Sequence, residues 1–389
     1  MRIGLFSDAY YPIISGVSIS VATLSRELKK LGHEVIIITN GHDLATYSED
    51  IVRFKGTRIP MKGLREFRIG KVTSTKIAAI GDLNLDVIHC HTEFSMGRLG
   101  RKAGKKFNIP VVHTYHTMYE DYIFYITKVF SSPLTILSKW YSKKFADSAD
   151  EVIFPTMKVK KAFDGYGYAK TSHIIPTGIY LDKFKKDNYK EEYYLETRKK
   201  LGIEEDDFVL LFLGRMSREK SVETLIKKFK EISKSKDNVK LLLVGGGPDL
   251  NYFKDLANEL GIRDKLICAG MVMPYEVPFY YHISTLFVNF SITETQGLTY
   301  IEALASGVPL LVKYDDNLEG VIKPGENGFS FTDDKEFVPL FNKLYNNNDL
   351  LNKITKNSSE ACIERFSAEQ YAFNVLDIYN SLLKKDKHI

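Results

Sequence analysis

Short apolar segments of strand length alternate with helical patterns along most of this chain, and this alternation limits the fold more than any other feature. The first cycle runs from an apolar segment at Arg2 to Ser7, through apolar residues at helical spacing from Val17 to Leu31, to a second apolar segment at Val35 to Thr39. Strands connected by helices in this way pair in parallel, with right-handed crossovers. The pattern predicts an α/β protein built on parallel sheets.

The alternation occurs in two series, which predicts two Rossmann-like β/α/β domains. Further strands are expected at 87–90, 111–113 and 152–154 in the first series, and at 208–213, 240–244, 266–268, 286–288 and 310–312 in the second. A length of 389 residues also suits two domains of ~100–200 residues each. We expect domains at 1–175 and 176–366, with a C-terminal helix at about 367–389 packing back on the first; the polar stretch 182–207 is expected to be a linker with a small exposed helix.

The charge of the chain is unevenly distributed, although its net value is only +5. Residues 1–175 contain 25 Lys and Arg against 16 Asp and Glu, so this half carries +9 and the remainder carries −4. Such a difference indicates that the first half faces an anionic partner. Nucleic acid, a phosphorylated substrate and an acidic lipid surface are the three candidates.

The cysteines and the N-terminus favour a reducing compartment. The three cysteines are widely spaced and form no Cys-x-x-Cys motif, which argues against a disulfide framework or a zinc site. No apolar run reaches the ~18–20 residues that cross a bilayer. The first apolar segment lacks a small-residue cleavage site after it. We therefore expect a cytoplasmic protein that does not span a membrane.

The glycine motifs exclude two common activities of such folds. A nicotinamide-dependent enzyme needs Gly-x-Gly-x-x-Gly after its first strand, whereas residues 8–16 form a long aromatic loop with one glycine, Gly16. A second glycine cluster, 245–247, lacks the Lys-Ser/Thr ending of a P-loop. This cluster is either a turn before a helix or a phosphate contact.

Residues 291–307 predict a loop that leads into a helix N-terminus. Thr293 or Thr295 is the expected N-cap, and Gly297 allows the backbone to come close to a ligand. Free backbone N–H groups at such a terminus favour a diphosphate. An ordinary capped surface helix explains the same pattern, so the segment alone leaves both readings open.

Two pairs of charged residues are further candidates for ligand binding. Glu294 in the loop and Glu302 two turns down the helix are suited to holding hydroxyl groups of a sugar or a ribose. Arg215 and Lys220 leave the first strand of the second series together, at the edge where open α/β sheets bind ligands. A pair of phosphates suits both side chains, because Arg donates two hydrogen bonds to two phosphate oxygens and Lys acts as a point charge. A solvated basic turn is the alternative.

The order and spacing of Arg215, Lys220 and Glu294-x7-Glu302 resemble the pattern of retaining GT-B glycosyltransferases of family 4. The resemblance implies two Rossmann-like domains that face across a cleft, UDP-glucose as the donor substrate and no metal cofactor; no Asp-x-Asp occurs in the chain. It also implies that the donor-site residues are Gly16, Gly214, Arg215, Lys220, Met271, Val272, Glu294, Gln296, Gly297, Leu298 and Glu302.

The resemblance gives these residues roles. Arg215 and Lys220 would bind the diphosphate, Glu302 the ribose, and Glu294, with the backbone at 296–298, the sugar and phosphate. The turn 270–272 is similar to the base-binding turn of the family. Segment 176–184 resembles its interdomain segment, except at Tyr180, where an acidic residue is usual.

Two segments of the first half, 7–17 and 114–122, resemble bacterial diacylglycerol glucosyltransferases of the same family. In those relatives the position of Gly16 approaches the donor phosphate or the acceptor, and that of His116 lies beside the transferred sugar. The implied catalytic residues are His116, Arg215, Lys220 and Glu294. His89, His91 and His113 are expected to pack around the site or support it. The implied reaction is glucosyl transfer from UDP-glucose to the 3-hydroxyl of 1,2-diacylglycerol.

Two segments that combine basic and apolar residues are expected to attach the protein peripherally to the inner face of the cell membrane. One lies near 53–76, where Glu66 is the single acidic residue, and the other at 128–144, with the one tryptophan, Trp140. Basic residues attract anionic headgroups by ~1 kcal/mol each, and Trp, Phe and Leu insert at the acyl boundary. Solvated faces explain the same segments. Nucleic-acid binding ranks below both, because no recognised binding motif accompanies the charge.

Other activities fit the same sequence. Within the family, the donor can be UDP-galactose or UDP-GlcNAc, and the acceptor a phosphoinositide, a polysaccharide precursor or a protein serine. A nucleotide-sugar epimerase shares the two-domain architecture but needs no lipid surface. A protein that binds a UDP-sugar without consuming it is the last alternative.

Overall fold

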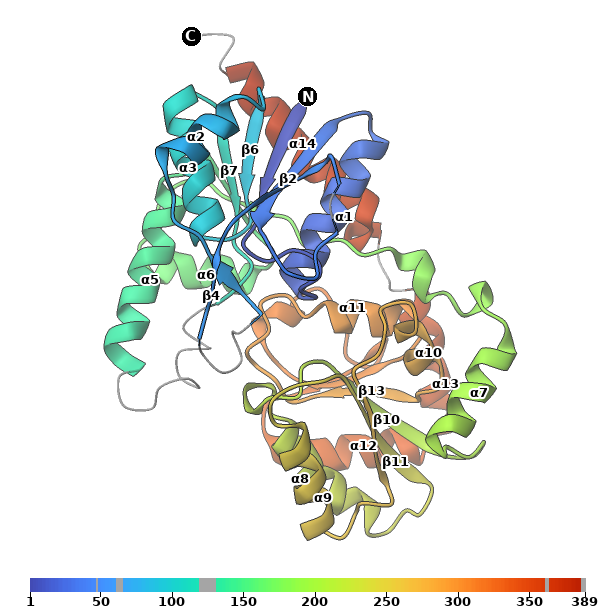
Figure 1. The fold of residues 1–389 in the computed structure, drawn as a ribbon. Helices are drawn as coiled ribbons and strands as arrows, with labels where there is room; N and C mark the ends of the chain where they lie inside the picture. The colour runs from blue at the N-terminus through green and yellow to red at the C-terminus, as the bar shows by residue number, and fades with distance from the viewer. Residues whose placement is uncertain (47, 61–65, 119–130, 361–363, 386–389) are drawn as a thin grey trace. The chain divides into compact units, whose positions relative to one another are not determined.

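The computed structural model describes residues 1–46, 48–60, 66–118, 131–360 and 364–385 (Figure 1). The chain divides into two compact units, one made of Met1–Ile179 and Arg365–Ile389 and the other of Tyr180–Glu364. The boundaries expected from the sequence lie within a few residues of these divisions. Each unit is an open parallel sheet with helices on both faces, which confirms the predicted fold class.

A seven-stranded parallel sheet forms the centre of the first unit, in the order β3-β2-β1-β6-β7-β8-β9. Its strands are β1 (Arg2–Phe6), β2 (Glu34–Asn40), β3 (Ile51–Phe54), β6 (Val87–Cys90), β7 (Val111–Thr114), β8 (Glu151–Phe154) and β9 (His173–Ile174). A short antiparallel hairpin, β4 (Thr57–Arg58) and β5 (Arg68–Ile69), stands apart from it. The strand order reverses at β1, between β2 and β6, and a doubly wound sheet binds its ligands at the carboxyl ends of such strands.

Helices cover both faces of this sheet. On one face lie α2 (Ser74–Gly81), α3 (Ser95–Phe107), α5 (Ser131–Asp147) and α6 (Met157–Gly165), and on the other α1 (Gly16–Lys30) and α14 (Ala368–Lys385). The C-terminal helix α14 belongs to the first unit and packs against α1. A buried hydrogen bond of 2.9 Å joins the hydroxyl groups of Tyr371 and Ser20 across that contact.

The second unit repeats the architecture with six parallel strands, in the order β12-β11-β10-β13-β14-β15. These are β10 (Phe208–Leu213), β11 (Val239–Val244), β12 (Leu266–Gly270), β13 (Leu286–Asn289), β14 (Leu310–Lys313) and β15 (Gly328–Phe331). The order reverses at β10, so the loops that follow β10 and β13 flank the edge at which a ligand is expected.

The helices of the second unit are α7 (Glu191–Leu201), α8 (Val222–Ser233), α9 (Leu250–Glu259), α10 (Val277–His282), α11 (Leu298–Ala305), α12 (Phe337–Tyr345) and α13 (Asn348–Glu360). Short 3-10 helices include η1 (Leu181–Phe184), η2 (Lys186–Asn188), η3 (Arg218–Lys220), η4 (Asp316–Leu318), η5 (Asp334–Glu336) and η6 (Glu364–Phe366). The predicted small helix is α7, which is not wholly exposed, because Tyr194 is buried against Phe279 and His282.

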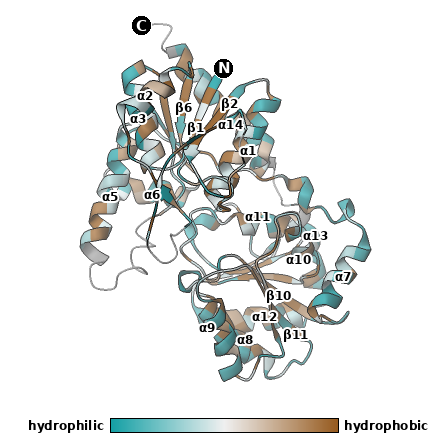
Figure 2. Ribbon diagram, viewed as in Figure 1, coloured by the Kyte–Doolittle hydropathy of each residue, from teal (hydrophilic) through white to brown (hydrophobic). Residues whose placement is uncertain are grey.

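Hydropathy follows the layers of each unit (Figure 2). The central strands are strongly apolar, and β10 and β2 are almost entirely buried. Strands of a parallel sheet are covered by helices on both faces, so they form continuous apolar runs and not an alternating pattern. This coverage explains why the strands nearest the candidate sites stood out in the sequence.

Candidate active site

Two loops of the second unit meet at the carboxyl edge where the strand order reverses. Lys220, at the end of η3, places Nζ 2.7 Å from Oε1 of Glu294, in the loop after β13. Their side chains are 11% and 21% exposed. The hydroxyl of Thr293 donates to the carbonyl of Glu219, and the amide of Asn317 donates to the carbonyl of Glu294. The structure therefore brings together two of the predicted site residues.

Close backbone packing explains two glycines of the cluster 245–247, namely Gly245 and Gly247. The amide of Gly214 donates to the carbonyl of Val244, and the amide of Gly245 donates to the carbonyl of Gly270. These hydrogen bonds connect the carboxyl ends of β10, β11 and β12. A Cβ at Gly245 would lie 2.0 Å from the carbonyl oxygen of Gly214, and one at Gly247 would lie 2.2 Å from that of Met216. Such distances exclude any side chain at Gly245 and Gly247, so these two glycines need no phosphate to account for them. A Cβ at Gly246 would meet only the Met271 side chain, with Cε at 3.1 Å.

An apolar turn and a basic side chain lie exposed at the same edge. Met271 is 81% exposed, and Met273 and Tyr275 of the turn that follows β12 are exposed as well. Val272 between them is half-buried, and Arg215 after β10 is exposed. Large apolar side chains that remain in solvent within a loop indicate a ligand surface, and a flat base suits this one.

The helix α11 starts differently from the prediction. Its N-cap is Gly297, in the left-handed region at φ +72°, and no side chain caps the helix, so the expected roles of Thr293 and Thr295 were wrong. A Cβ at Gly297 would lie 2.4 Å from the ring of Tyr300. This clash and the positive φ both require glycine at this position. The first backbone N–H groups of a helix have no partner within it. Without a side-chain cap, they are suited to an anion.

Glu302 lies little more than one turn into α11, closer to its start than the two turns predicted. The hydroxyl of Tyr281 donates to Oε2 of Glu302 over 2.9 Å. Burial raises the pKa of Glu302 from 4.5 to about 7, and the hydrogen bond from Tyr281 opposes that rise. Sequence reasoning missed Tyr281. Gln296 is buried and Leu298 half-buried beside the start of the helix.

In the first unit, Gly16 is the first residue of α1, directly after the N-cap Ser15, whose side chain forms a capping box with Ser18. Gly16 is exposed, and a Cβ there would meet nothing within 4 Å. Its φ is outside the left-handed region. Neither packing nor backbone conformation therefore requires glycine at this position.

Asp8, at the start of the loop that follows β1, has a buried carboxylate that the sequence did not single out. It accepts hydrogen bonds from the amide of Met96 at 3.1 Å, from Thr92 at 2.6 Å, from Asn40 at 2.9 Å and from Ser95. Since Phe94, the N-cap of α3, offers no side-chain cap, Asp8 takes that role. Burial raises the pKa of Asp8 despite these bonds.

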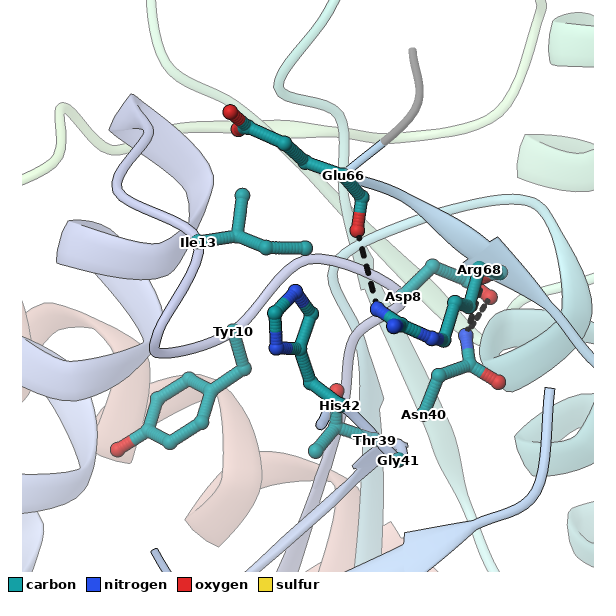
Figure 3. A pocket seen from close by; sticks show the side chains of 9 residues that line it. All are labelled: Asp8, Tyr10, Ile13, Thr39, Asn40, Gly41, His42, Glu66 and Arg68. Carbon is teal, nitrogen blue, oxygen red and sulfur yellow. Dashed lines mark hydrogen bonds between the residues drawn. The ribbon is translucent and has the colours of Figure 1, made fainter. Parts of the chain in front are cut away.

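A small pocket opens beside Asp8 at the carboxyl edge of β1 and β2 (Figure 3). Ile13 from the loop after β1 and His42 after β2 extend towards it, with Arg68 on the hairpin opposite, while the ring of Tyr10 is directed away from these side chains. The full lining is Asp8, Tyr10, Ile13, Thr39, Asn40, Gly41, His42, Glu66 and Arg68. The pocket is polar on the Arg68 side and aromatic or apolar on the other.

Four histidines gather at the carboxyl ends of β6 and β7. His116 and His91 lie in the loops after these strands, with His91 Nδ1 2.9 Å from His116 Nε2 and their rings stacked at an interplanar angle of 19°. His89, His91 and His113 are buried, as expected. Burial, with a smaller contribution from His113, lowers the pKa of His116 to about 3. The imidazole of His116 is therefore neutral at physiological pH.

The two expected membrane segments differ in how far their basic and apolar side chains are exposed. On α5, Ile136, Leu137 and Trp140 are exposed on one face, with the Lys144 ammonium 4.7 Å from the centre of the Trp140 ring. In the segment 53–76, Arg68 is buried and bonded to Asp43 at 2.7 Å, so its place on an exposed basic surface was wrong.

Parts of these predictions lie outside the described residues, namely 61–65, 119–122 and 128–130. Within the described part of the chain, no helix is long and apolar enough to cross a membrane. The same described residues include no group of three or more His, Cys, Asp or Glu side chains arranged to hold a metal ion.

Comparisons with known proteins match both halves of the chain. The family model described as "Glycosyltransferase Family 4" matches residues 14–183, and that described as "Glycosyl transferases group 1" matches residues 194–361. The chain is 36% identical to an α-monoglucosyldiacylglycerol synthase of Acholeplasma laidlawii over 99% of this chain and 98% of that protein. It is 39% identical to a synthase of the same name from Streptococcus pneumoniae, over 83% and 73%.

A solved structure has the same fold. Alr3699/HepE of Anabaena, in complex with UDP and glucose, superposes with a TM-score of 0.78 at 16% identity, covering 98% of this chain and 100% of its own.

Proposed function

The chain belongs to the family 4 glycosyltransferases, hexosyltransferases of the GT-B fold, and from this membership we propose that it transfers glucose from UDP-glucose to the 3-hydroxyl of 1,2-diacylglycerol. The product is α-monoglucosyldiacylglycerol. The observation that carries the proposal is the 36% identity with a synthase of that product over almost the full length of both chains. The UDP and glucose bound by a protein of the same fold support the choice of donor.

The second unit holds the donor in this proposal. Lys220 and Arg215 neutralise the diphosphate, and the uncapped start of α11 adds backbone N–H groups to the same task. Glu302 accepts hydrogen bonds from the ribose hydroxyls, and the exposed turn at Met271 stacks on the uracil base. Charge that develops on the leaving UDP is the main electrostatic demand of the reaction, and preorganised donors meet it without reorganisation.

The transfer proceeds with retention of configuration. The bond between the anomeric carbon and the β-phosphate oxygen breaks, and a bond from the same carbon to the acceptor oxygen forms on the same face. The proton of the acceptor hydroxyl passes to a phosphate oxygen of UDP, so no side chain has to act as the base. His116 contacts the transferred glucose, and its neutral imidazole suits hydrogen bonding better than proton abstraction.

The acceptor belongs to the first unit. The exposed face of α5 holds the protein on an anionic membrane surface, because Trp and aliphatic side chains insert at the acyl boundary while lysines contact the headgroups.

The test is an assay of purified protein with radiolabelled UDP-glucose and vesicles of diacylglycerol and anionic phospholipid. We expect label in an organic-phase lipid with the mobility of monoglucosyldiacylglycerol, formed about 10²- to 10³-fold more slowly by the Lys220→Ala variant. Release of UDP without labelled lipid would support UDP-glucose as the donor and contradict diacylglycerol as the acceptor. Label transferred only from UDP-galactose or UDP-GlcNAc overturns the choice of glucose.

A further inference from the structure

Two neutral histidines share one hydrogen bond at the carboxyl edge of the first sheet. His91 Nδ1 and His116 Nε2 are 2.9 Å apart, so one of them donates a proton and the other accepts it. Burial lowers the pKa of His91 well below 6.5, as it does that of His116. Each ring therefore carries a single N–H, and only two arrangements of the pair are possible.

The remaining nitrogen of His91 decides between them. Its Nε2 is buried and has no hydrogen-bond partner among the described residues. If His116 donated the shared bond, His91 would carry its own proton on this unpartnered nitrogen. A buried N–H without a partner is rarer in proteins than a buried acceptor without one. The favoured arrangement therefore has His91 donating from Nδ1, with only a lone pair left on its buried Nε2.

This arrangement fixes the proton of His116. With Nε2 accepting from His91, the single proton of the His116 ring must sit on Nδ1. That nitrogen makes no hydrogen bond within the described part of the chain, and the residue is partly exposed. His116 therefore presents an N–H donor, and not a lone pair, to any ligand that reaches it.

The ring of His91 is itself held in place. The ring of His89 packs against it, with ring centroids 4.1 Å apart and an interplanar angle of 32°. His89 is bonded through Nδ1 to the hydroxyl of Tyr379 on α14 at 2.6 Å, and through Nε2 to that of Thr114 at 2.7 Å. The C-terminal helix thus supports the histidine pair through its contact with His89.

From this geometry we infer that His91 is a positioning residue, which holds His116 in the Nδ1–H tautomer so that His116 donates a hydrogen bond to a hydroxyl of the transferred sugar. The inference deepens the proposed function and rests on it for the identity of the ligand. The tautomer itself does not depend on that function, because it is set in the unliganded protein. His116 then orients the sugar, and the proton of the acceptor stays with the departing phosphate.

The first test is NMR of the unliganded protein with ¹⁵N-labelled histidine, in which long-range ring couplings report the tautomer of each imidazole. We expect His116 as Nδ1–H in the wild type and a rise of the Nε2–H form in His91→Phe, which keeps an aromatic ring and removes the donor. His91→Asn, whose amide can donate from the position of Nδ1, should restore the Nδ1–H form. A His116 ring that is Nε2–H in the wild type overturns the inference.

The second test separates positioning from folding. His91→Phe should lower kcat roughly tenfold, the equivalent of one hydrogen bond, with a smaller change in KM for UDP-glucose, and His91→Asn should recover most of it. The matched control is His113→Asn, a buried histidine of the same sheet bonded to the carbonyl of Cys90. It should leave the tautomer of His116 unchanged even where it lowers Tm.

The two proposals fail in different ways. A protein that makes no glucosyl lipid but shows the Nδ1–H form of His116, lost in His91→Phe, disproves the proposed function and supports the positioning. A protein that makes the lipid while His91→Phe retains both the wild-type tautomer and the wild-type kcat disproves the positioning alone.

Discussion

Lys220 and Glu294, 74 residues apart in the chain, form an ion pair of 2.7 Å between the loops that follow β10 and β13. These strands are neighbours in the sheet, at the point where the strand order reverses. Both side chains are largely buried, so each partner would be left partly desolvated if the other were removed. In our proposal, the arrival of the donor gives Lys220 a phosphate and Glu294 a sugar hydroxyl as additional partners.

Replacing Lys220 by Ala is expected to lower kcat about 10²- to 10³-fold, the usual cost of one donor that stabilises transition-state charge. Arg215→Ala should also reduce turnover strongly. Circular dichroism should show an intact fold for both variants. The control is Lys227→Ala, which removes an exposed lysine paired with Glu223 on α8 and should keep normal turnover. Near-normal activity of both the Lys220 and the Arg215 variants would contradict the donor site.

The fold was predictable from the sequence to the extent that the strands are covered on both faces. The central strands β1, β2, β10 and β11 are apolar runs and were found within a residue or two of their ends. The missed strands are at or near the sheet edges. In β3 the four residues Ile51–Phe54 are all half-buried, and β9 has only two residues, so neither produces an apolar run.

The candidate donor-site residues were selected from the sequence for a different reason, and their role in binding the donor stays a prediction. Arg215, Lys220, Glu294 and Glu302 carry the family resemblance, and the structure pairs two of them directly. The supporting residues were not predictable, because Tyr281 and Asp8 act through contacts that join separate elements. Tyr281 reaches Glu302 from another helix, and Asp8 reaches the start of α3 from the end of β1. No local spacing in the sequence reports such contacts.

Replacing Tyr281 by Phe is expected to weaken donor binding. The hydroxyl of Tyr281 lowers the pKa of Glu302, so its removal should raise that pKa above its present value of about 7. The ionised carboxylate is the better acceptor for ribose hydroxyls. We therefore expect KM for UDP-glucose to rise about fivefold at pH 7 and the acid limb of kcat/KM to shift to higher pH.

The pH dependence of kcat/KM for UDP-glucose checks this expectation. The control is Tyr280→Phe, which changes a buried tyrosine next to Tyr281 on the same helix. An unshifted acid limb in the Tyr281 variant would show that Glu302 does not titrate in donor binding.

Replacing Glu302 by Gln should stabilise the unliganded protein at alkaline pH. Burial raises the pKa of Glu302 from 4.5 to about 7, so the folded protein binds a proton that the unfolded chain has lost between these values. Wild-type stability is consequently expected to fall as pH rises through this window and to stay lower above it. The effect is at most between about 3 and 4 kcal/mol, because a shift from 4.5 to about 7 contributes about 1.4 kcal/mol for each pH unit.

Urea unfolding of both proteins at pH 5 and pH 8 measures this difference. The variant should gain stability relative to the wild type from pH 5 to pH 8, while its affinity for UDP-glucose falls. A relative stability that does not change with pH would mean that Glu302 is not held in an unfavourable charged state.

Gly16→Ala should separate stability from activity. A Cβ at Gly16 meets no atom within 4 Å, and the residue begins α1 with ordinary backbone geometry. Alanine favours a helix over glycine by up to about 1 kcal/mol, so Tm should stay constant or rise. If the donor phosphate or the acceptor approaches this position, the added methyl group should reduce turnover at least about tenfold. An active variant with unchanged KM values would remove Gly16 from the site.

The exposed apolar face of α5 is expected to govern membrane attachment. Ile136 is 69% exposed and Trp140 53% exposed. Burying such side chains at an acyl boundary contributes about 25 cal/mol per Å². Ile136→Ser should therefore lower the affinity for vesicles of phosphatidylglycerol about tenfold, and Trp140→Ser by more.

The matched control for this face is Leu195→Ser on α7. Leu195 is 60% exposed, which makes it an equally accessible aliphatic side chain on the other unit. Its replacement should leave the fraction of protein that sediments with vesicles unchanged. Sedimentation of the wild type should also fall as salt rises, because Lys139 and Lys144 on α5 act through a screened attraction. Equal losses in the Ile136 and Leu195 variants would mean that attachment is not specific to α5, and the membrane would then have to be contacted elsewhere on the chain.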